Sequence, residues 1–316
     1  MDSFPTRLSQ AIEDKGSCLV VGLDPVLERL PGEVLGAFGS YVGMDNDGFQ
    51  IHAAKAAGSL ALFCTEVVQA VAPYAAAVKP NTAFFERFGP AGFDALVHVC
   101  RTAKKQGLLV ILDAKRGDLS STAEAYAQGL LGDIRDTPGE VTDALTLQPY
   151  MGWDCIRPFL EVAREHGKGL FVLVRTSNPS AEDFQELQSD GEPIYCHVAR
   201  KVQEWGKDDR DSSGLSLVGA VVGATAPEQA ERVRSILDSC FFLVPGYGAQ
   251  GAGADSIKPH LLPGGKGVVV NASRSILYAH EKNTEVPWRE AVAQQARSSR
   301  DELEAVRALS ISPNSG

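Results

Sequence analysis

The sequence predicts an α/β protein, a single-domain (β/α)8 TIM barrel, and two observations lead to this prediction. Eight short runs rich in Val, Leu and Ile recur along the 316 residues, and each ends in a polar or glycine-containing cluster. Stretches with helical patterns lie between these runs, so that strand and helix alternate. Hydrophobicity within the runs is continuous, as in parallel strands that are covered on both faces. An open doubly wound sheet is the alternative arrangement of the same elements.

The predicted strands are apolar runs that close on a charged, polar or glycine residue. The third of them, "LLVILDAK", has five apolar residues followed by a carboxylate and an ammonium. Such a run is too short for a typical buried helix and is rich enough in branched residues for a strand. In chain order, the strands are expected at 17–24, 75–80, 108–115, 144–150, 170–177, 217–225, 240–248 and 267–274.

The predicted helices fill the intervals between these strands. Several of them end at a glycine, as at Gly107, Gly167 and Gly206, which is a common way for a helix to stop. A final apolar-periodic segment follows the eighth strand and is expected to close the barrel. The helices are expected at 53–74, 89–107, 121–133, 152–167, 192–206, 226–240 and 286–309.

Two connections are long for a compact domain, 24–52 and 178–192. Loops of this length often act as lids over a site. No low-complexity linker or internal repeat divides the chain, so residues 1–316 are expected to form one domain, with 310–316 as a frayed tail.

The charge balance limits the kinds of partner. Lys and Arg number 30 against 40 Asp and Glu, which gives a formal net charge of −10. A nucleic-acid-binding surface would require a basic face, so this class of partner is not expected. An anionic substrate would have to be held by a few local cations.

The cysteines and the N-terminus indicate a cytoplasmic protein. No two of the six cysteines form a CxxC pair, and most lie in apolar surroundings, so buried free thiols are expected. The first residues lack the basic and apolar regions of a signal peptide. No apolar run approaches 18 residues, so no membrane span is expected.

Polar side chains collect where the predicted strands end, which is where a barrel builds its active site. Asp113 and Lys115 are two residues apart on one strand and therefore share a face, and Lys79 ends the neighbouring strand. Asp118 and Thr122 follow in the loop and the next helix. A structural ion-pair network is the alternative, but buried pairs of this kind are costly to build. The remaining polar strand ends are Asp24, Ser177, Gln250 and Arg274.

The last two strand ends predict a phosphate site. "VPGYGAQGAG" is rich in glycine, and "NASRSI" places Arg274 at the start of a helical turn. Barrels often hold phosphate between the loops after strands seven and eight. A phosphate at one wall and a Lys–Asp–Lys–Asp array at the other indicate an enzyme acting on a phosphosugar or a nucleotide.

At these residues the chain resembles orotidine 5′-monophosphate decarboxylase, in the longer bacterial and archaeal group of that family. The central motif is Asp113-Ala-Lys115-Arg-Gly-Asp118 with Thr122 four residues further on. Ser273 stands where the family more commonly has glycine before the arginine, so the resemblance implies the Arg274 contact to phosphate more firmly than a backbone contact. The other matching stretches are "VGLDP", "VKPNTAFFERFG", "QPYMGWDCIRPFL", "VRTSNPS", "VPGYGAQG" and "NASRSI".

The resemblance implies conversion of orotidine 5′-monophosphate to uridine 5′-monophosphate in pyrimidine biosynthesis, without a cofactor or metal. It implies a homodimer in which Asp118 and Thr122 reach the partner's site. The catalytic array would be Lys79, Asp113, Lys115 and Asp118. Asp24 and Lys79 would lie near the ribose hydroxyls, where Thr122 of the partner subunit helps. Ser177 would face the pyrimidine, and Gln250 and Arg274 would hold the phosphate.

The chemistry explains why such an array would be needed. Loss of CO2 from C6 of the pyrimidine leaves an electron pair in the ring plane, where the π system cannot delocalise it. Lys115 is suited to stabilise this carbanion as an ammonium and then to protonate it. The loop 249–262 is expected to close over the phosphate.

Three other classes of protein remain open on the sequence. A metal-dependent decarboxylase or aldolase acting on a sugar phosphate could use the same barrel, but it would need acidic metal ligands and would not need Lys79. A Schiff-base aldolase using Lys115 is disfavoured because an adjacent Asp keeps a lysine protonated. The third class is a non-catalytic nucleotide-binding barrel.

Overall fold

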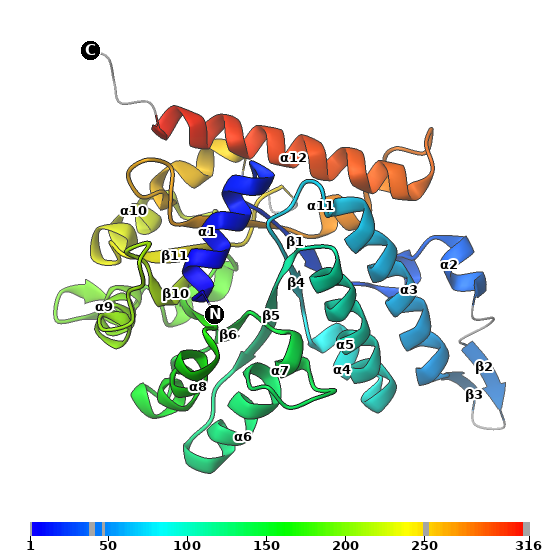
Figure 1. Cartoon of the computed structure of the whole chain (residues 1–316), viewed down its shortest axis with the longest axis horizontal. Helices are drawn as coiled ribbons and strands as arrows, with labels where there is room; N and C mark the ends of the chain where they lie inside the picture. Colours follow the sequence, from blue (N-terminus) through cyan, green and yellow to red (C-terminus); the bar gives the residue numbers. More distant parts are fainter. Residues whose placement is uncertain (1, 38–41, 46–47, 249–252, 312–316) are drawn as a thin grey trace.

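The computed structural model of the chain describes residues 2–37, 42–45, 48–248 and 253–311. Eight parallel strands close into a barrel, which confirms the predicted fold class and excludes the open sheet (Figure 1). Strands that are consecutive along the chain are neighbours, and the last strand pairs with the first. They are β1 (Leu19–Leu23), β4 (Ala77–Pro80), β5 (Leu109–Arg116), β6 (Ala144–Leu147), β7 (Gly169–Arg175), β10 (Ser216–Val222), β11 (Cys240–Val244) and β12 (Val268–Ala272).

The seven predicted helices are all present and surround the barrel (Figure 1). Their apolar faces pack on the strands, and the barrel interior is filled by the strands' own branched side chains. All six cysteines are buried and unpaired, as expected. The helices are α3 (Ala53–Val71), α5 (Gly89–Lys105), α6 (Ser120–Leu131), α8 (Trp153–His166), α9 (Ile194–Gly206), α10 (Pro227–Ile236) and α12 (Trp288–Ile311).

Helix α3 is long and apolar enough to span a membrane, although no span was expected from the sequence. Half of its apolar stretch is buried in the protein. The buried residues, among them Leu60, Phe63, Val67 and Val71, recur at spacings of three and four and so lie on one face. This face packs against α5 and α12, so α3 is a core helix of the barrel.

The helix α1 (Phe4–Lys15) was not predicted. Phe4 packs edge-on against Phe171, with the ring centres 5.9 Å apart. A Cβ at Gly169 would lie 2.1 Å from the Phe4 ring, so the first residue of β7 must be glycine for α1 to pack there. The helix therefore covers the N-terminal end of the barrel.

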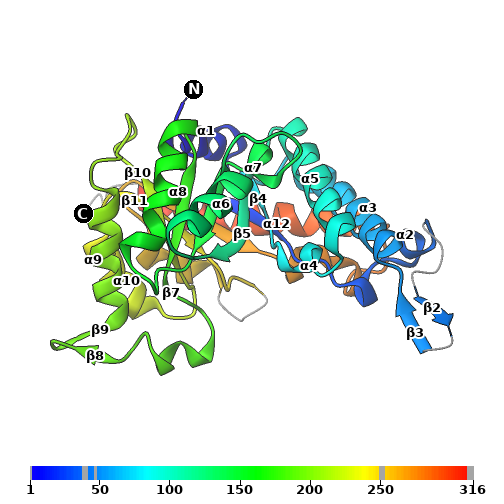
Figure 2. The same ribbon diagram turned by 90° about the horizontal axis from the view of Figure 1, so that it is seen from below.

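The two long connections contain short elements of their own. The segment 24–52 holds η1 (Leu27–Arg29), α2 (Gly32–Ala37) and a hairpin of β2 (Val42–Asp45) and β3 (Gly48–Ile51). The segment 178–192 holds η2 (Pro179–Asp183) and the start of a hairpin formed by β8 (Gln188–Ser189) and β9 (Glu192–Pro193). Figure 2 shows both hairpins projecting at the end of the molecule away from α1.

The remaining elements are short helical segments between the larger ones. α12 continues through Ser310 and Ile311, the first two residues of the predicted frayed tail, and residues 312–316 lie outside the described residues. The short segments are α4 (Ala83–Glu86), α7 (Pro138–Val141), η3 (Ala254–His260), α11 (Arg274–Leu277) and η4 (Ala279–Glu281).

A buried histidine ties the segment η3 to the barrel. The ring Nε2 of His260 donates to the carbonyl of Gly223, 3.2 Å away, and Nδ1 has no hydrogen-bond partner among the residues that the structure describes. Burial, together with the nearby Arg234 guanidinium, lowers the pKa of His260 to about 4. The ring is therefore neutral in the folded protein at neutral pH.

This histidine should make the fold less stable in acid. The unfolded chain binds a proton near pH 6.5 whereas the folded chain does not until about pH 4, so stability should fall as the pH falls through this window. At about 1.4 kcal/mol per pKa unit, the loss is a few kcal/mol. Urea unfolding of wild type and His260→Gln between pH 7 and 4 measures it. The free energy of unfolding should depend less on pH in His260→Gln than in wild type, whereas a substitution of the exposed His98 should not change this dependence. An equal dependence on pH in wild type and His260→Gln would contradict the lowered pKa of His260.

Candidate active site

The buried carboxylate of Asp113 organises the charged residues at the end of β5. Its Oδ2 accepts a hydrogen bond from Lys79 Nζ, and its Oδ1 accepts one from Lys115 Nζ at 2.5 Å. The hydroxyl of Thr146 on β6 donates a third bond to Oδ1, at 3.0 Å. The structure therefore brings Lys79, Asp113 and Lys115 together.

The surrounding charges keep both buried side chains, Asp113 and Lys79, ionised. Burial alone would raise the pKa of Asp113, but Lys79 and Lys115 hold it well below its usual value. Burial alone would lower the pKa of Lys79, but the carboxylates of Asp113 and Asp24 raise it above its usual value. Both side chains are almost completely buried, so a negative charge and a positive charge are paired in a site that is largely shielded from solvent.

Lys115 differs from its two partners in being accessible. Its side chain is 47% exposed, whereas that of Asp113 is 7% exposed. Its backbone φ is +47°, a left-handed conformation that is uncommon for a residue with a Cβ. Lys115 is thus the accessible end of the ion-paired series Lys79–Asp113–Lys115, and its ammonium lies at the barrel mouth.

Unpaired polar atoms mark the ends of β1 and β12. The Oδ1 atom of Asp24, the Oδ1 atom of Asn271 and the hydroxyl of Ser275 are buried without a hydrogen-bond partner among the described residues. Buried polar atoms are normally paired, so such a group is typical of a site that bonds a ligand or water. Asp24 was predicted here from its place at a strand end. Asn271 was missed because it lies inside a predicted strand.

Asp118 and Thr122 lie apart from the charged array of their own chain. Asp118 is half-buried and its Oδ1 accepts a bond from the backbone N–H of Leu119, at 2.7 Å. No ion pair joins it to Lys79 or Lys115 within the part of the chain that the structure describes. Thr122 is exposed on the first turn of α6. Neither residue therefore bonds the array of its own chain.

Ser177 lies beside a cavity at the end of β7. The cavity has a volume of about 570 Å³, and its wall includes Arg175, Asn178 and Thr225. The hydroxyl of Thr225 donates to the carbonyl of Ser177, at 3.2 Å. A Cβ at Gly223 would lie 2.9 Å from the Cα of Ser177, so a glycine is required for this close approach.

The structure describes only part of the predicted phosphate site. Arg274 is exposed at the start of α11, and its guanidinium makes no hydrogen bond or ion pair to the described residues. The glycine loop comes close to it, because a Cβ at Gly248 would lie 3.1 Å from the hydroxyl of Ser275. Gln250 lies outside the described residues, as do residues 249–252 of the loop 249–262.

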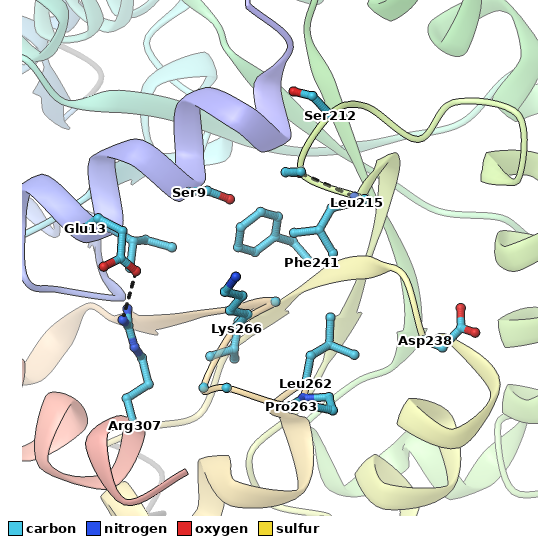
Figure 3. A pocket seen from close by; sticks show the side chains of 17 residues that line it. Ser9, Glu13, Ser212, Leu215, Asp238, Phe241, Leu262, Pro263, Lys266 and Arg307 are labelled. Carbon is cyan, nitrogen blue, oxygen red and sulfur yellow. Dashed lines mark hydrogen bonds and ion pairs between the residues drawn. The ribbon is translucent and has the colours of Figure 1, made fainter. Parts of the chain in front are cut away.

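A larger cavity of about 770 Å³ lies at the opposite end of the barrel and contains none of the predicted site residues. Figure 3 shows it between α1, which contributes Ser9 and Glu13, and the starts of β11 and β12. Lys266 and Arg307 line it, and Arg307 is paired with Glu13 at 3.3 Å. Barrel enzymes place their chemistry at the other end, so this cavity is not the candidate site.

Among the described residues, no cluster of three or more His, Cys, Asp or Glu side chains is placed to hold a metal ion.

Comparison with known proteins identifies the relatives of the chain. Residues 56–287 match the model of the orotidine 5′-phosphate decarboxylase / HUMPS family. Orotidine 5′-phosphate decarboxylase from Rhodopirellula baltica is 42% identical over 299 residues, 92% of this chain and 96% of the relative. The enzyme of the same name from Caldicellulosiruptor bescii is 40% identical over 89% of this chain and 91% of its own. The structure of Leishmania donovani OMP decarboxylase superposes with a TM-score of 0.72 at 32% identity, covering 97% and 99% of the two chains.

Proposed function

The chain belongs to the orotidine 5′-phosphate decarboxylase family, and we infer that it converts orotidine 5′-monophosphate to uridine 5′-monophosphate, a step of pyrimidine biosynthesis. It is accordingly a carboxy-lyase. The metal-dependent sugar-phosphate enzyme is not favoured, because relatives at 35–45% identity over most of the chain are named as the decarboxylase.

One observation carries the proposed mechanism: a buried carboxylate, Asp113, bonds two ammonium groups at the end of β5. Asp113 fixes Lys115 at the barrel mouth, and Lys79 is held on the other oxygen. We propose that the Lys115 ammonium stabilises the C6 carbanion as CO2 leaves and then donates its proton to C6. Because the charges are already in place, little reorganisation is needed when the negative charge develops.

The size of the barrier reduction requires binding energy from parts of the substrate away from C6. Enzymes lower barriers by roughly 8–23 kcal/mol, whereas one preorganised donor supplies about 3–4 kcal/mol. We propose that the phosphate, held by Arg274 and Gln250, supplies binding energy that positions the pyrimidine against Lys115. Asp24 would accept from a ribose hydroxyl, which its unpaired buried Oδ1 favours. Ser177 would face the pyrimidine edge.

We further propose a homodimer in which Asp118 and Thr122 complete the partner's site. Two facts support it: Asp118 has no ion pair to the array of its own chain, and apolar side chains are exposed on its loop and on neighbouring segments. These side chains come from the loop and helix after β5 and from the loop and helix after β6, which pack together. A second copy of the chain would cover them. They are Leu119, Tyr126, Tyr150, Met151 and Trp153.

The enzyme is proposed to work without a cofactor or metal, in the cytoplasm, and without nucleic-acid or membrane partners. The six buried free thiols suit a reducing compartment. The test is the loss of orotidine 5′-monophosphate absorbance on addition of purified protein that has been dialysed against a chelator. Treated and untreated protein should have equal rates and form uridine 5′-monophosphate. Activity that disappears with the chelator and returns with a divalent cation would contradict the proposal.

Arg274→Ala should lower kcat/KM on orotidine 5′-monophosphate by about a hundredfold or more, because a bidentate charged contact to phosphate is lost. KM should rise, and kcat should fall if phosphate binding drives the positioning of the pyrimidine. On the nucleoside orotidine, wild type and variant should be similarly slow. Substitution of the exposed Arg297 on α12 serves as the control. An equal cost on both substrates would show that Arg274 does not bind phosphate.

A further inference from the structure

Thr146 is a buried hydroxyl in an otherwise apolar strand. Its neighbours on β6 are Ala144, Leu145 and Leu147, and the whole strand is buried. Both hydrogen bonds of the hydroxyl go to β5. It donates to Asp113 Oδ1 at 3.0 Å and accepts from the backbone N–H of Lys115 at 3.0 Å.

The pairing of the two strands shows why a side chain is needed here. Leu112 pairs with Leu145, and Arg116 pairs with Leu147, so β5 advances four residues (112 to 116) while β6 advances two (145 to 147). The extra residues of β5 form a bulge, and Lys115 lies in it with its left-handed φ of +47°. The Lys115 N–H meets the Thr146 hydroxyl in place of a strand carbonyl.

The bulge decides where the Lys115 side chain points. In a regular strand the Cα atom of Lys115 would lie two residues beyond that of Asp113 on the same face, about 6–7 Å further along the strand. In the observed bulge its ammonium returns to within 2.5 Å of Asp113 Oδ1, the oxygen that Thr146 also bonds. One hydroxyl therefore contacts both the backbone and the counter-ion of Lys115.

We propose that Thr146 is a positioning residue for Lys115. Its oxygen holds the left-handed backbone of the bulge, and its proton fixes the Asp113 carboxylate that orients the ammonium. A hydroxyl has a single proton, so these two bonds admit one arrangement, with the proton on the Asp113 side. The proposal rests on the proposed role of Lys115 as the proton donor.

The test is a set of purified variants assayed on orotidine 5′-monophosphate. Thr146→Val keeps the shape and removes the hydroxyl, so kcat should fall by about ten- to a hundredfold, as expected for a misplaced catalytic group. KM should change far less, because Thr146 touches no part of the proposed phosphate or ribose site. Thr146→Ser restores the hydroxyl and should stay within about threefold of wild type.

Thr142 provides a matched control. It is buried, and its hydroxyl donates to the carbonyl of Pro138 at 2.7 Å, away from β5. Thr142→Val also loses a buried hydroxyl, but it should keep the wild-type kcat. If Thr146→Val fails to fold, Thr146→Cys replaces it, since a thiol is a weak donor and acceptor and should also lower kcat by at least about fivefold.

The outcomes separate this inference from the proposed function. Lys115→Ala is assayed alongside, and its inactivity would support the role of Lys115 whatever Thr146 does. If Lys115→Ala is inactive but Thr146→Val keeps wild-type kcat, the positioning role is wrong and the mechanism stands. Equal losses in Thr146→Val and Thr146→Ser, or a loss confined to KM, would also overturn it.

Discussion

Replacing Lys115 by alanine should reduce decarboxylation of orotidine 5′-monophosphate by a factor of at least about a thousand, because both a preorganised cation and a proton donor are lost. The barrel should remain folded. The Lys115 side chain is 47% exposed, so its removal leaves no buried cavity, and Asp113 keeps its bonds to Lys79 and Thr146. Turnover and circular dichroism of the purified variant measure the two effects.

Lys266→Ala is the control for this substitution. Lys266 is an exposed lysine in the cavity at the opposite end of the barrel, so its loss should leave turnover unchanged (Figure 3). A Lys115→Ala enzyme that folds and keeps more than a small fraction of wild-type turnover would show that another group donates the proton.

Mixing two inactive variants, Asp118→Asn and Lys115→Ala, should restore activity. Asp118 makes no ion pair to the array of its own chain, and the proposed dimer brings it to the partner's Lys115. A hybrid dimer then has one site with both substitutions and one with neither. With free exchange of subunits, half of the dimers are hybrids, so about a quarter of wild-type activity should return.

A second mixture controls for this complementation. Lys79 and Lys115 bond the same Asp113, so they belong to one site of one chain. Mixing Lys79→Ala with Lys115→Ala should therefore restore nothing. If subunit exchange is demonstrated and the Asp118→Asn mixture stays inactive, the site is not shared between subunits.

The strands and the charged array could be predicted from the sequence because both depend on local pattern. A parallel strand that is buried on both faces must be apolar throughout, as "LLVIL" is before Asp113. Charges directly after such a run must lie at the barrel mouth, which is why Lys79, Asp113 and Lys115 were predicted together. Asp24 and Arg274 follow from the same argument.

The features that were missed depend on tertiary contacts. The bulge at Lys115 is a shift between β5 and β6, and nothing in "DAKRG" alone indicates it. Thr146 has the same type of side chain as many solvent-facing threonines, and its role appears only from its two partners on β5. The helix α1, by contrast, was missed although its signals are local: Phe4, Leu8 and Ile12 recur every four residues on one face, and Gly16 ends the helix in the left-handed conformation.

The most direct test of the central claim, that Lys115 protonates the C6 carbanion, uses the product alone. A group that delivers a proton to C6 must also be able to remove one from C6 of uridine 5′-monophosphate, since the forward and reverse steps share a transition state. Proton NMR of uridine 5′-monophosphate in D2O with the wild-type enzyme should therefore show slow loss of the C6 proton signal. Lys115→Ala should leave that signal unchanged over the same period, and exchange by Lys115→Ala at the wild-type rate would contradict the account.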